Sequence, residues 1–316
     1  MDNREKEGEL FFQAYEVLEK LYDDKGRNLC YYYGEPHRFY HNWEHITSML
    51  KSAKEQNILS EDLMLAILFH DIIYDPKEKD NEEKSAELFK IYYPSKIDVY
   101  NAILETKTHK PTTSLSSRLC KLDLEVLYSD FNTFANYENN IFKEYQFVDY
   151  KTYVEKRIEV LEKFNVHPFC IDYIKYRKPK IAVYPGSFNP FHKGHYNVLI
   201  KAEEIFDKVI IARGINPSKN NEIVDLPIQI QNRQIETYSC LQNQFVDSLG
   251  YDVTIVRGLR NSNDFNEEQM QYRVLRDLKP DIKIISFFSD IDTEHISSTA
   301  IRTLNKFGEN GNRYLL

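Results

Sequence analysis

The chain has 316 residues, of which 42% are hydrophobic and 28% charged, and its formal net charge is −8. This length is typical of two domains, and the composition is ordinary for a soluble globular protein. The acidic balance argues against a general nucleic-acid-binding protein, although a local basic pocket for phosphate groups remains compatible with it. The cysteines include no CxxC pair, which argues against a zinc cluster or a disulfide framework and is typical of a reducing compartment.

Neither a targeting segment nor a membrane span is predicted. The first ten residues, MDNREKEGEL, are too highly charged for a signal peptide. The longest apolar stretch, LMLAILF at 63–69, is too short to cross a bilayer. We therefore expect a cytoplasmic protein that does not bind membranes.

The first half of the chain has the apolar spacing of helices almost throughout. Apolar residues recur at i, i+3 and i+4, which is typical of amphipathic helices. Ser60, followed by Glu61 and Asp62, is a typical helix start, and Pro76 a typical stop. The predicted helices span 10–22, 45–55, 61–74, 82–93, 98–107 and 153–164. We expect an all-α domain over residues 1–178.

The second half alternates between short β-branched runs and helical stretches. The predicted strands span 181–187, 208–214, 252–258 and 281–289, and the predicted helices span 195–206, 229–245, 265–278 and 297–307. Strands and helices that alternate at this spacing predict a parallel, doubly wound sheet. The character of the sequence changes at KYRKPK (175–180), and we therefore expect a second, Rossmann-like α/β domain over residues 179–316.

One predicted strand ends in a histidine pair. AVYPGSFNPFHKGH, at 182–195, places His192 and His195 at the start of a helix that follows the strand. Ligands of open α/β sheets bind at the carboxyl ends of strands, and a helix N-terminus attracts phosphate. Histidines at i and i+3 share one face there and could stabilise charge on a phosphoryl group.

Three segments of this half resemble nucleotidyltransferases. GSFNPFHKGH resembles the (H/T)xGH signature of that superfamily, and RGLRNSNDFNEEQ (257–269) and ISSTAIR (296–302) resemble later motifs of pantetheine-phosphate adenylyltransferases. In that family a glutamate stands eight places after the second arginine, as Glu268 does here. The resemblance implies transfer of AMP from ATP to 4′-phosphopantetheine, with Mg²⁺, by direct in-line attack on the α-phosphorus.

The resemblance also implies which residues form the site. Catalytic roles are implied for His192, His195 and Lys219. ATP would be bound by Ser187, Phe188, His195, Arg260, Glu268, Ser297, Ser298 and Thr299. The acceptor would be bound by Ser187, Lys219 and Arg257.

The sequence resemblance leaves two candidate acceptors for the AMP group. Asn189 replaces the family's more usual aspartate, and His192 stands where threonine is more frequent. NPFHKGH and ISSTAIR also resemble nicotinamide-mononucleotide adenylyltransferases, so a pyridine mononucleotide is the alternative acceptor. The segment from Arg257 to Glu268 favours 4′-phosphopantetheine.

The first half carries a separate histidine pattern. The segments are EPHRFYHNWEHITSML (35–50) and LFHDIIYDPKEKDNEEKSA (68–86). A buried His70–Asp71 pair is costly unless the carboxylate is paired or binds a metal. His45, on an earlier helix, and Asp123, on a later one, would complete a nitrogen and oxygen ligand set. Such a set favours Mn, Fe, Ni or Co over calcium.

This order of residues resembles the HD-domain metal-dependent phosphohydrolases. The resemblance implies a metal-activated water that attacks a phosphoester, and Asp75 or Glu83 would orient that water. His41 and His109 either contribute to the same pocket or are structural histidines. A regulatory nucleotide-binding module is the alternative to an active hydrolase.

These inferences combine into a bifunctional enzyme. We expect it to act on ATP with a small phosphorylated acceptor and, in the first domain, on a phosphoester. We expect no nucleic-acid partner, and we expect a homo-oligomer.

Overall fold

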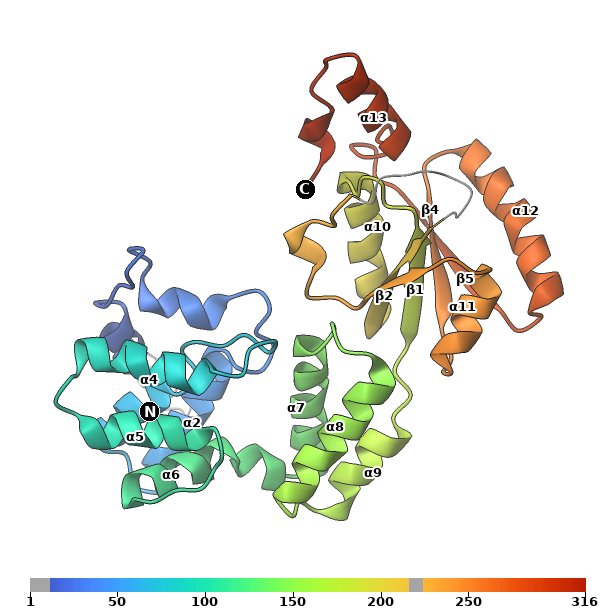
Figure 1. Cartoon of the computed structure of the whole chain (residues 1–316). Coiled ribbons are helices and arrows are strands. Elements are labelled where there is room, and N and C mark those ends of the chain that lie inside the picture. The colour runs from blue at the N-terminus through green and yellow to red at the C-terminus, as the bar shows by residue number, and fades with distance from the viewer. Residues whose placement is uncertain (1–11, 216–223) are drawn as a thin grey trace, which may run out of the picture. The chain divides into compact units, whose positions relative to one another are not determined.

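The structure is a computed structural model that describes residues 12–215 and 224–316 (Figure 1). The described chain divides into two compact units. One comprises the residues up to Tyr145 together with Arg157–Lys175, and the other comprises Gln146–Lys156 and the residues from Tyr176 onward. The sequence-based division after residue 178 assigns 146–156 to the first domain, whereas the contacts of this segment assign it to the second unit.

The first unit is helical, as the sequence predicts. Residues 12–18 are helical, and two short 3₁₀ segments span Leu29–Gly34 and Glu125–Tyr128. The longer helices are α2 (Trp43–Glu55), α3 (Glu61–Phe69), α4 (Asn81–Tyr92), α5 (Ile97–Thr106), α6 (Ser114–Asp123), α7 (Phe131–Glu144), α8 (Tyr150–Lys163) and α9 (Pro168–Tyr176). The start of α8 lies in the second unit.

Polar caps and one apolar helix organise this unit. Asn42 caps α2, Ser60 caps α3 and Thr113 caps α6, each by accepting a backbone N–H of the first turn. From Leu63 to Phe69, helix α3 buries every side chain except that of Met64, which is partly buried, as expected of a helix at the centre of a core. Helices α2 and α6, which carry two of the predicted metal ligands, and α3, which the other two follow directly, contact one another.

Helix α3 is shorter than predicted. The apolar pattern extends to residue 74, but the helix ends at Phe69 and His70 is its C-cap. The guanidinium of Arg38, whose side chain is fully buried, donates hydrogen bonds to the carbonyl oxygens of Asp71 and Ile72, at 2.7 and 2.8 Å. The arginine thereby stabilises the non-helical backbone that follows His70.

The second unit contains one five-stranded parallel sheet, in the order β3-β2-β1-β4-β5. The strands are β1 (Ile181–Gly186), β2 (Lys208–Gly214), β3 (Ile235–Tyr238), β4 (Thr254–Leu259) and β5 (Lys283–Phe288). The helices are α10 (Lys193–Glu203), α11 (Gln242–Leu249), α12 (Ser262–Leu278) and α13 (Ser298–Lys306), and two 3₁₀ segments span Ile228–Ile230 and Gly311–Tyr314. The predicted doubly wound parallel sheet is confirmed.

Helices cover both faces of this sheet (Figure 1). Successive residues of a strand point to opposite faces. Ala182 and Tyr184 of β1 pack in a cluster with α10, whereas Ile181 and Val183 pack in a cluster with Phe245 of α11. Because both faces are buried, the inner strands are continuous apolar runs rather than alternating ones.

One predicted helix is wrong. The sequence predicts a helix over 229–245, but residues 235–238 form β3, and α11 begins only at Gln242. Strand β3 is four residues long, lies at the edge of the sheet and is largely half-buried. A short edge strand of this kind lacks the apolar run by which a buried strand is recognised.

A buried lysine at the start of β2 binds the segment from Gln146 to Val148 within the second unit. The ammonium of Lys208 donates hydrogen bonds to the carbonyl oxygens of Gln146 and, at 2.9 Å, of Val148. The backbone N–H of Gln234 also donates to the Gln146 carbonyl, at 2.9 Å. Burial lowers the pKa of Lys208 to about 7, although Asp149 and Glu236 act in the opposite direction.

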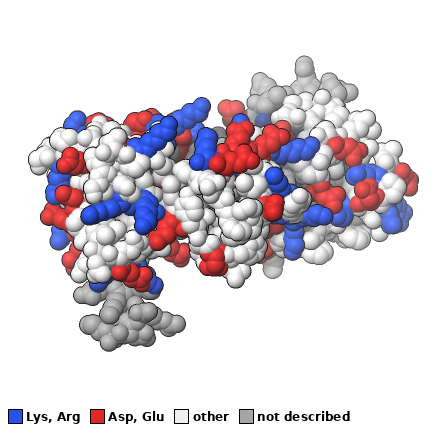
Figure 2. Space-filling model, turned by 90° about the horizontal axis from the view of Figure 1, so that it is seen from below, with Lys and Arg blue, Asp and Glu red and all other residues white. Residues whose placement is uncertain are grey.

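Acidic and basic side chains intermingle over the face drawn in Figure 2. Across the stretches 12–215 and 224–316, none of the helices combines the length and the apolar character that a membrane span requires.

Candidate functional sites

A pocket of about 290 Å³ lies at the carboxyl ends of β1 and β4. These neighbouring strands form the point at which the strand order reverses, where ligands of doubly wound sheets bind. The residues that line the pocket include Tyr184, Gly186, Phe188, His192, His195, Arg257, Arg260, Asp264, Glu268, Ser297 and Ser298.

The turn after β1 is tightly packed around Phe188. A Cβ atom at Gly186 would lie 2.7 Å from the Phe188 ring, so glycine is required there unless the ring moves. Phe188 itself has a left-handed backbone, with φ of 47°. Its buried ring packs against the His195 imidazole in a T-shaped arrangement, with ring centroids 5.1 Å apart. The turn therefore holds His195 from one side.

His192 and His195 cap the N-terminus of α10 reciprocally. Nδ1 of His192 accepts from the backbone N–H groups of Gly194 and His195, at 3.2 and 3.4 Å. Nδ1 of His195 accepts from the backbone N–H of His192, at 3.3 Å. The two rings stack, with centroids 3.7 Å apart. Because a backbone N–H can only donate, both Nδ1 atoms are unprotonated and both neutral rings carry their proton on Nε2.

Both imidazoles are neutral at pH 7. Burial and the charge of Arg260 lower the pKa of His192 to about 4. Burial, His192 and Arg260 hold the pKa of His195 well below its usual range. The pair can therefore offer two Nε2–H donors at a helix N-terminus without introducing a full charge.

Two arginines of the pocket are each held by a carboxylate of α12. Nε of Arg257 lies 2.8 Å from Oε2 of Glu268, as an ion pair rather than a well-directed hydrogen bond. Arg257 also donates from Nη2 to Oε1 of Gln242, at 2.6 Å. Arg260 and Asp264 form two parallel hydrogen bonds, at 2.8 and 2.9 Å. Both acids stand four residues apart, on one face of α12.

The structure places only some of the remaining predicted residues in this pocket. Ser297 caps α13 and Ser298 donates to the Pro190 carbonyl, at 2.9 Å, and both line the pocket. Ser187 is exposed between two pocket residues. The hydroxyl of Thr299 accepts from Arg302 and does not line the pocket. Lys219 lies outside the described residues.

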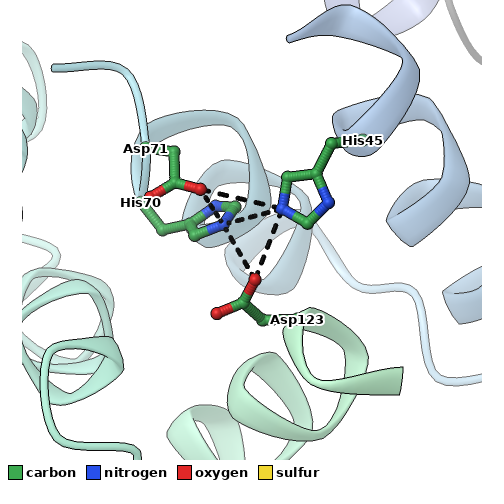
Figure 3. A group of neighbouring side chains, drawn as sticks. All are labelled: His45, His70, Asp71 and Asp123. Carbon is green, nitrogen blue, oxygen red and sulfur yellow. Dashed lines mark hydrogen bonds and ion pairs between the residues drawn. The ribbon is translucent and has the colours of Figure 1, made fainter. Parts of the chain in front are cut away.

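A second site lies in the helical unit, where four side chains converge (Figure 3). Each of His45, His70, Asp71 and Asp123 offers one ligand atom, and these four atoms lie within 4.8 Å of one another. His70 Nε2 is 3.0 Å from Asp71 Oδ2, and His45 Nε2 is 3.3 Å from Asp123 Oδ1. The structure therefore brings together all four ligands that the sequence predicts.

Hydrogen bonding and burial suit this cluster to a cation. Nδ1 of His70 donates to the Ile67 carbonyl, at 2.9 Å, which directs the other ring nitrogen at the cluster. The two imidazoles are nearly fully buried, whereas each carboxylate retains 17% side-chain exposure. The donor set of two nitrogens and two oxygens is that of a divalent transition metal, open to solvent on the carboxylate side.

The carboxylates and His70 of the cluster stabilise one another's charged forms. Burial on its own raises the pKa of Asp71 and Asp123, but their interactions with the histidines outweigh it and lower both pKa values. Burial on its own lowers the pKa of His70, but Asp71 and Asp123 raise it above its usual range. Both carboxylates are therefore ionised, and a divalent cation would replace the proton that His70 holds.

A histidine beside the cluster is held by a buried glutamate. Nδ1 of His41 lies 2.6 Å from Oε2 of Glu144, which also accepts from the Tyr74 hydroxyl at 2.7 Å. Oε1 of Glu144 accepts from the backbone N–H groups of Tyr40 and His41, at 2.7 and 3.0 Å. The Glu144 side chain is fully buried. Sequence reasoning missed Glu144, since its partners lie 70 to 104 residues earlier in the chain.

The two acids predicted to orient a water lie on the surface. Asp75 is exposed and accepts from the Lys77 N–H, and Glu83 is exposed and pairs with Lys107. Glu82, the neighbour of Glu83, is half-buried instead, and burial followed by the charge of Asp71 raises its pKa. Glu82, unlike Asp75 and Glu83, is therefore partly shielded from solvent and interacts electrostatically with a residue of the cluster.

Comparison with known proteins concerns the α/β domain. A sequence profile of the cytidylyltransferase-like family matches residues 183–304. The fold, the histidine pair and this match define a nucleotidyltransferase domain. A phosphopantetheine adenylyltransferase of Mycoplasma capricolum is 37% identical over 135 residues, which are 40% of this chain and 96% of the relative. One of Cytophaga hutchinsonii is 33% identical over 137 residues, 40% of this chain and 91% of the relative.

Through this domain, the chain belongs to the phosphopantetheine adenylyltransferase family. A solved structure, a bifunctional NMN adenylyltransferase/ADP ribose pyrophosphatase from Francisella tularensis complexed with AMP and a manganese ion, is 20% identical and covers 44% of each chain. The TM-score of this match is 0.31.

Proposed function

We propose that the α/β domain transfers AMP from ATP to 4′-phosphopantetheine, giving dephospho-CoA and pyrophosphate. The observation that carries the proposal is the pair of Nε2–H donors of His192 and His195, beside two oriented arginines, at the switch point of the sheet. The named activity of the relatives gives independent support.

The proposed reaction needs no covalent intermediate. A phosphate oxygen of the acceptor would attack the α-phosphorus while the bond to the bridging oxygen breaks, and pyrophosphate leaves with that electron pair. The imidazole of His195 would donate to an α-phosphate oxygen, and His192 would donate beside it. Arg260 would bind ATP phosphates, with Ser297 and Ser298 as further donors, and Mg²⁺ would accompany ATP. Glu268 would lie near the ribose, Phe188 and Ser187 near the nucleotide, and Lys219 near the transferred group.

Phosphopantetheine is preferred over a pyridine mononucleotide as acceptor. Arg257 is held on two sides, by Glu268 and Gln242, so its guanidinium is oriented before any substrate binds. Such an arginine suits an acceptor phosphate, which both candidate acceptors carry. The preference for phosphopantetheine therefore rests on the named activity of the relatives.

Identification of the product tests this proposal. Purified protein is incubated with ATP, Mg²⁺ and 4′-phosphopantetheine, and the mixture is analysed by mass spectrometry. Dephospho-CoA should form with the wild type and much more slowly with Arg257→Ala. Arg273→Ala, on the exposed side of α12, is the matched control and should retain the wild-type rate. Absence of dephospho-CoA would refute the proposed acceptor.

We further propose that the helical unit is a metal-dependent phosphohydrolase, which makes the chain bifunctional. The convergence of His45, His70, Asp71 and Asp123 supports this second activity. These residues would hold Mn, Fe, Ni or Co, and such an ion lowers the pKa of a bound water. His41 would bind a phosphoester oxygen through Nε2, since Glu144 engages its Nδ1. Asp75 and Glu83, both surface residues, have less support than Glu82 as the carboxylate that orients water.

A regulatory module is the alternative role for this unit. His70→Ala and Asp71→Ala separate the two roles in the full chain. Loss of bound metal together with loss of phosphatase activity supports a hydrolase. Loss of metal with altered adenylyltransferase kinetics alone supports regulation. A cytoplasmic location and a homo-oligomeric state stay predictions.

A further inference from the structure

His109 occupies a strained position just beyond α5. Its φ is 50°, in the left-handed region that non-glycine residues rarely adopt, and its N–H closes the helix by donating to the Glu105 carbonyl at 2.9 Å. Glycine or asparagine is the usual residue at such a helix end. The backbone alone therefore does not explain the histidine.

The side chain of His109 reaches a predicted metal ligand. Its Nε2 lies 2.8 Å from Oδ2 of Asp123, and both side chains are only 17% exposed. The Phe164 ring packs against the imidazole in a T-shaped arrangement, with centroids 5.4 Å apart, and limits its movement. An ionised carboxylate can only accept hydrogen bonds, so Nε2 of His109 is the donor.

The two oxygens of Asp123 consequently have different partners. Oδ1 lies 3.3 Å from His45 Nε2 and 3.6 Å from His70 Nε2, within the cluster, whereas Oδ2 is engaged by His109. A carboxylate whose second oxygen accepts a hydrogen bond presents one oxygen to a cation rather than two.

We propose that His109 is a positioning residue that fixes Asp123 as a one-oxygen ligand of a divalent cation. The inference rests on the proposed metal site of the helical unit and adds a residue and a coordination mode to it. With one oxygen of Asp123 withheld, a coordination position remains for water or for a phosphate oxygen. The strained backbone is the consequence of aiming the imidazole at Asp123.

Equilibrium binding of Co²⁺ to the full chain tests this inference. His109→Gly keeps the left-handed turn but removes the imidazole, and His109→Gln keeps an N–H donor near the position of Nε2. Asn57→Gly, at another left-handed residue (φ 54°), is the matched control. Loss of an outer hydrogen bond to a ligand typically weakens metal binding about 10–100-fold, which we expect for His109→Gly. Binding by Asn57→Gly should equal that of the wild type, and His109→Gln should recover most of the loss.

The visible absorption spectrum of bound Co²⁺ gives a second readout, because it depends on the number of donor atoms. In His109→Gly, Asp123 is free to bind through both oxygens, so the spectrum should change. The spectrum of His109→Gln should resemble that of the wild type. Circular dichroism and thermal unfolding of each variant verify its fold.

The outcomes separate this inference from the proposed function. A wild-type chain that binds no Co²⁺ overturns the metal site and the inference together. If the wild type binds Co²⁺ and His109→Gly binds it with the same affinity and the same spectrum, only the role of His109 is overturned. Equal losses of Co²⁺ affinity in His109→Gly and His109→Gln also overturn this role, because the hydrogen bond to Asp123 would then not determine metal binding.

Discussion

The imidazoles of His192 and His195 each accept the backbone N–H of the other residue, at 3.3 and 3.4 Å, so the first turn of α10 fixes the tautomer of both rings. A capping role and a catalytic role are therefore not alternatives here. Each cap places a proton on the distal nitrogen, where a phosphate oxygen can accept it.

The His195 donor should dominate the rate of adenylyl transfer. Removal of one donor to a developing negative charge typically lowers kcat about 10²–10³-fold, and we expect this for His195→Ala. The exposed His295 provides the control, and His295→Ala should retain the wild-type kcat. The measurement is steady-state pyrophosphate release. A His195→Ala enzyme within threefold of wild type would exclude this role.

His192 allows the cap and the distal donor to be separated. Threonine also caps helices, so His192→Thr should unfold with nearly the wild-type free energy, whereas His192→Ala should lose about 1 kcal/mol. Both variants lack Nε2, so both should lower kcat, by less than His195→Ala does. Urea unfolding and kinetics of the two variants provide the comparison. Full activity in His192→Thr would reduce the role of His192 to capping.

The pair of Arg260 and Asp264 should affect ATP binding more than chemistry. Asp264 holds the guanidinium through two hydrogen bonds. Asp264→Asn should raise the KM for ATP about tenfold and leave kcat within about threefold, because an arginine that must be ordered on binding weakens affinity. The surface carboxylate Asp281, paired with Lys279, supplies the control variant Asp281→Asn. A tenfold loss in kcat with no change in the KM for ATP would contradict this role.

Stability of the chelator-treated protein should depend on pH through His41 and Glu144. Burial on its own raises the pKa of Glu144, but His41 lowers it from an ordinary 4.5 to about 2, so its contribution is present above pH 4.5 and is lost toward pH 2. Burial on its own lowers the pKa of His41, but Glu144 raises it above 6.5. The contribution of His41 to folding stability is therefore complete below pH 6.5 and is lost as pH rises through that raised pKa. The pair therefore stabilises most between these limits.

The variant Glu144→Gln checks this window. At pH 5.5 it should lower the free energy of unfolding by about 3 kcal/mol, the low end for breaking a buried ion pair. The loss should shrink at pH 3.5 and at pH 8.5. The exposed Glu125 gives the control Glu125→Gln, with little effect at any pH. A loss that is constant across pH would show that the charge of the pair is not involved.

Metal binding should raise the thermal stability of the full chain. An ion present at 100 times its Kd stabilises by about 2.7 kcal/mol, or roughly 5–10 °C for a unit of this size. Scanning calorimetry with Mn²⁺ should show this shift for the wild type and for Asp75→Ala, and EDTA should reverse it. His70→Ala should show no shift. A shift that persists in His70→Ala would place the ion elsewhere.

The sequence predicted the features that local patterns encode. The inner strands β1, β2 and β4 are apolar runs, and Ser60 marks the start of α3, so both were predicted correctly. The predicted ligands His45, His70, Asp71 and Asp123 follow the order of a known family along the chain, which singled them out although they are far apart in the sequence, and the structure brings them together.

Features that depend on distant partners were missed. The end of α3 depends on Arg38, more than 30 residues earlier, which binds carbonyls that a longer helix would use internally. Glu144 is held by His41 and Tyr74, and nothing in its own neighbourhood marks it. Glu82 and Glu83 differ by one position on α4, and only the packing of that helix decides which of them is half-buried.

Pyrophosphate release from ATP, compared among three acceptors, tests the central claim most directly. The purified chain with Mg²⁺ receives 4′-phosphopantetheine, nicotinamide mononucleotide or nicotinic acid mononucleotide, with His195→Ala as the inactive control. We predict His195-dependent release with 4′-phosphopantetheine and none above background with either mononucleotide. Release with a mononucleotide alone would contradict the proposed acceptor and assign the transferase to pyridine nucleotides.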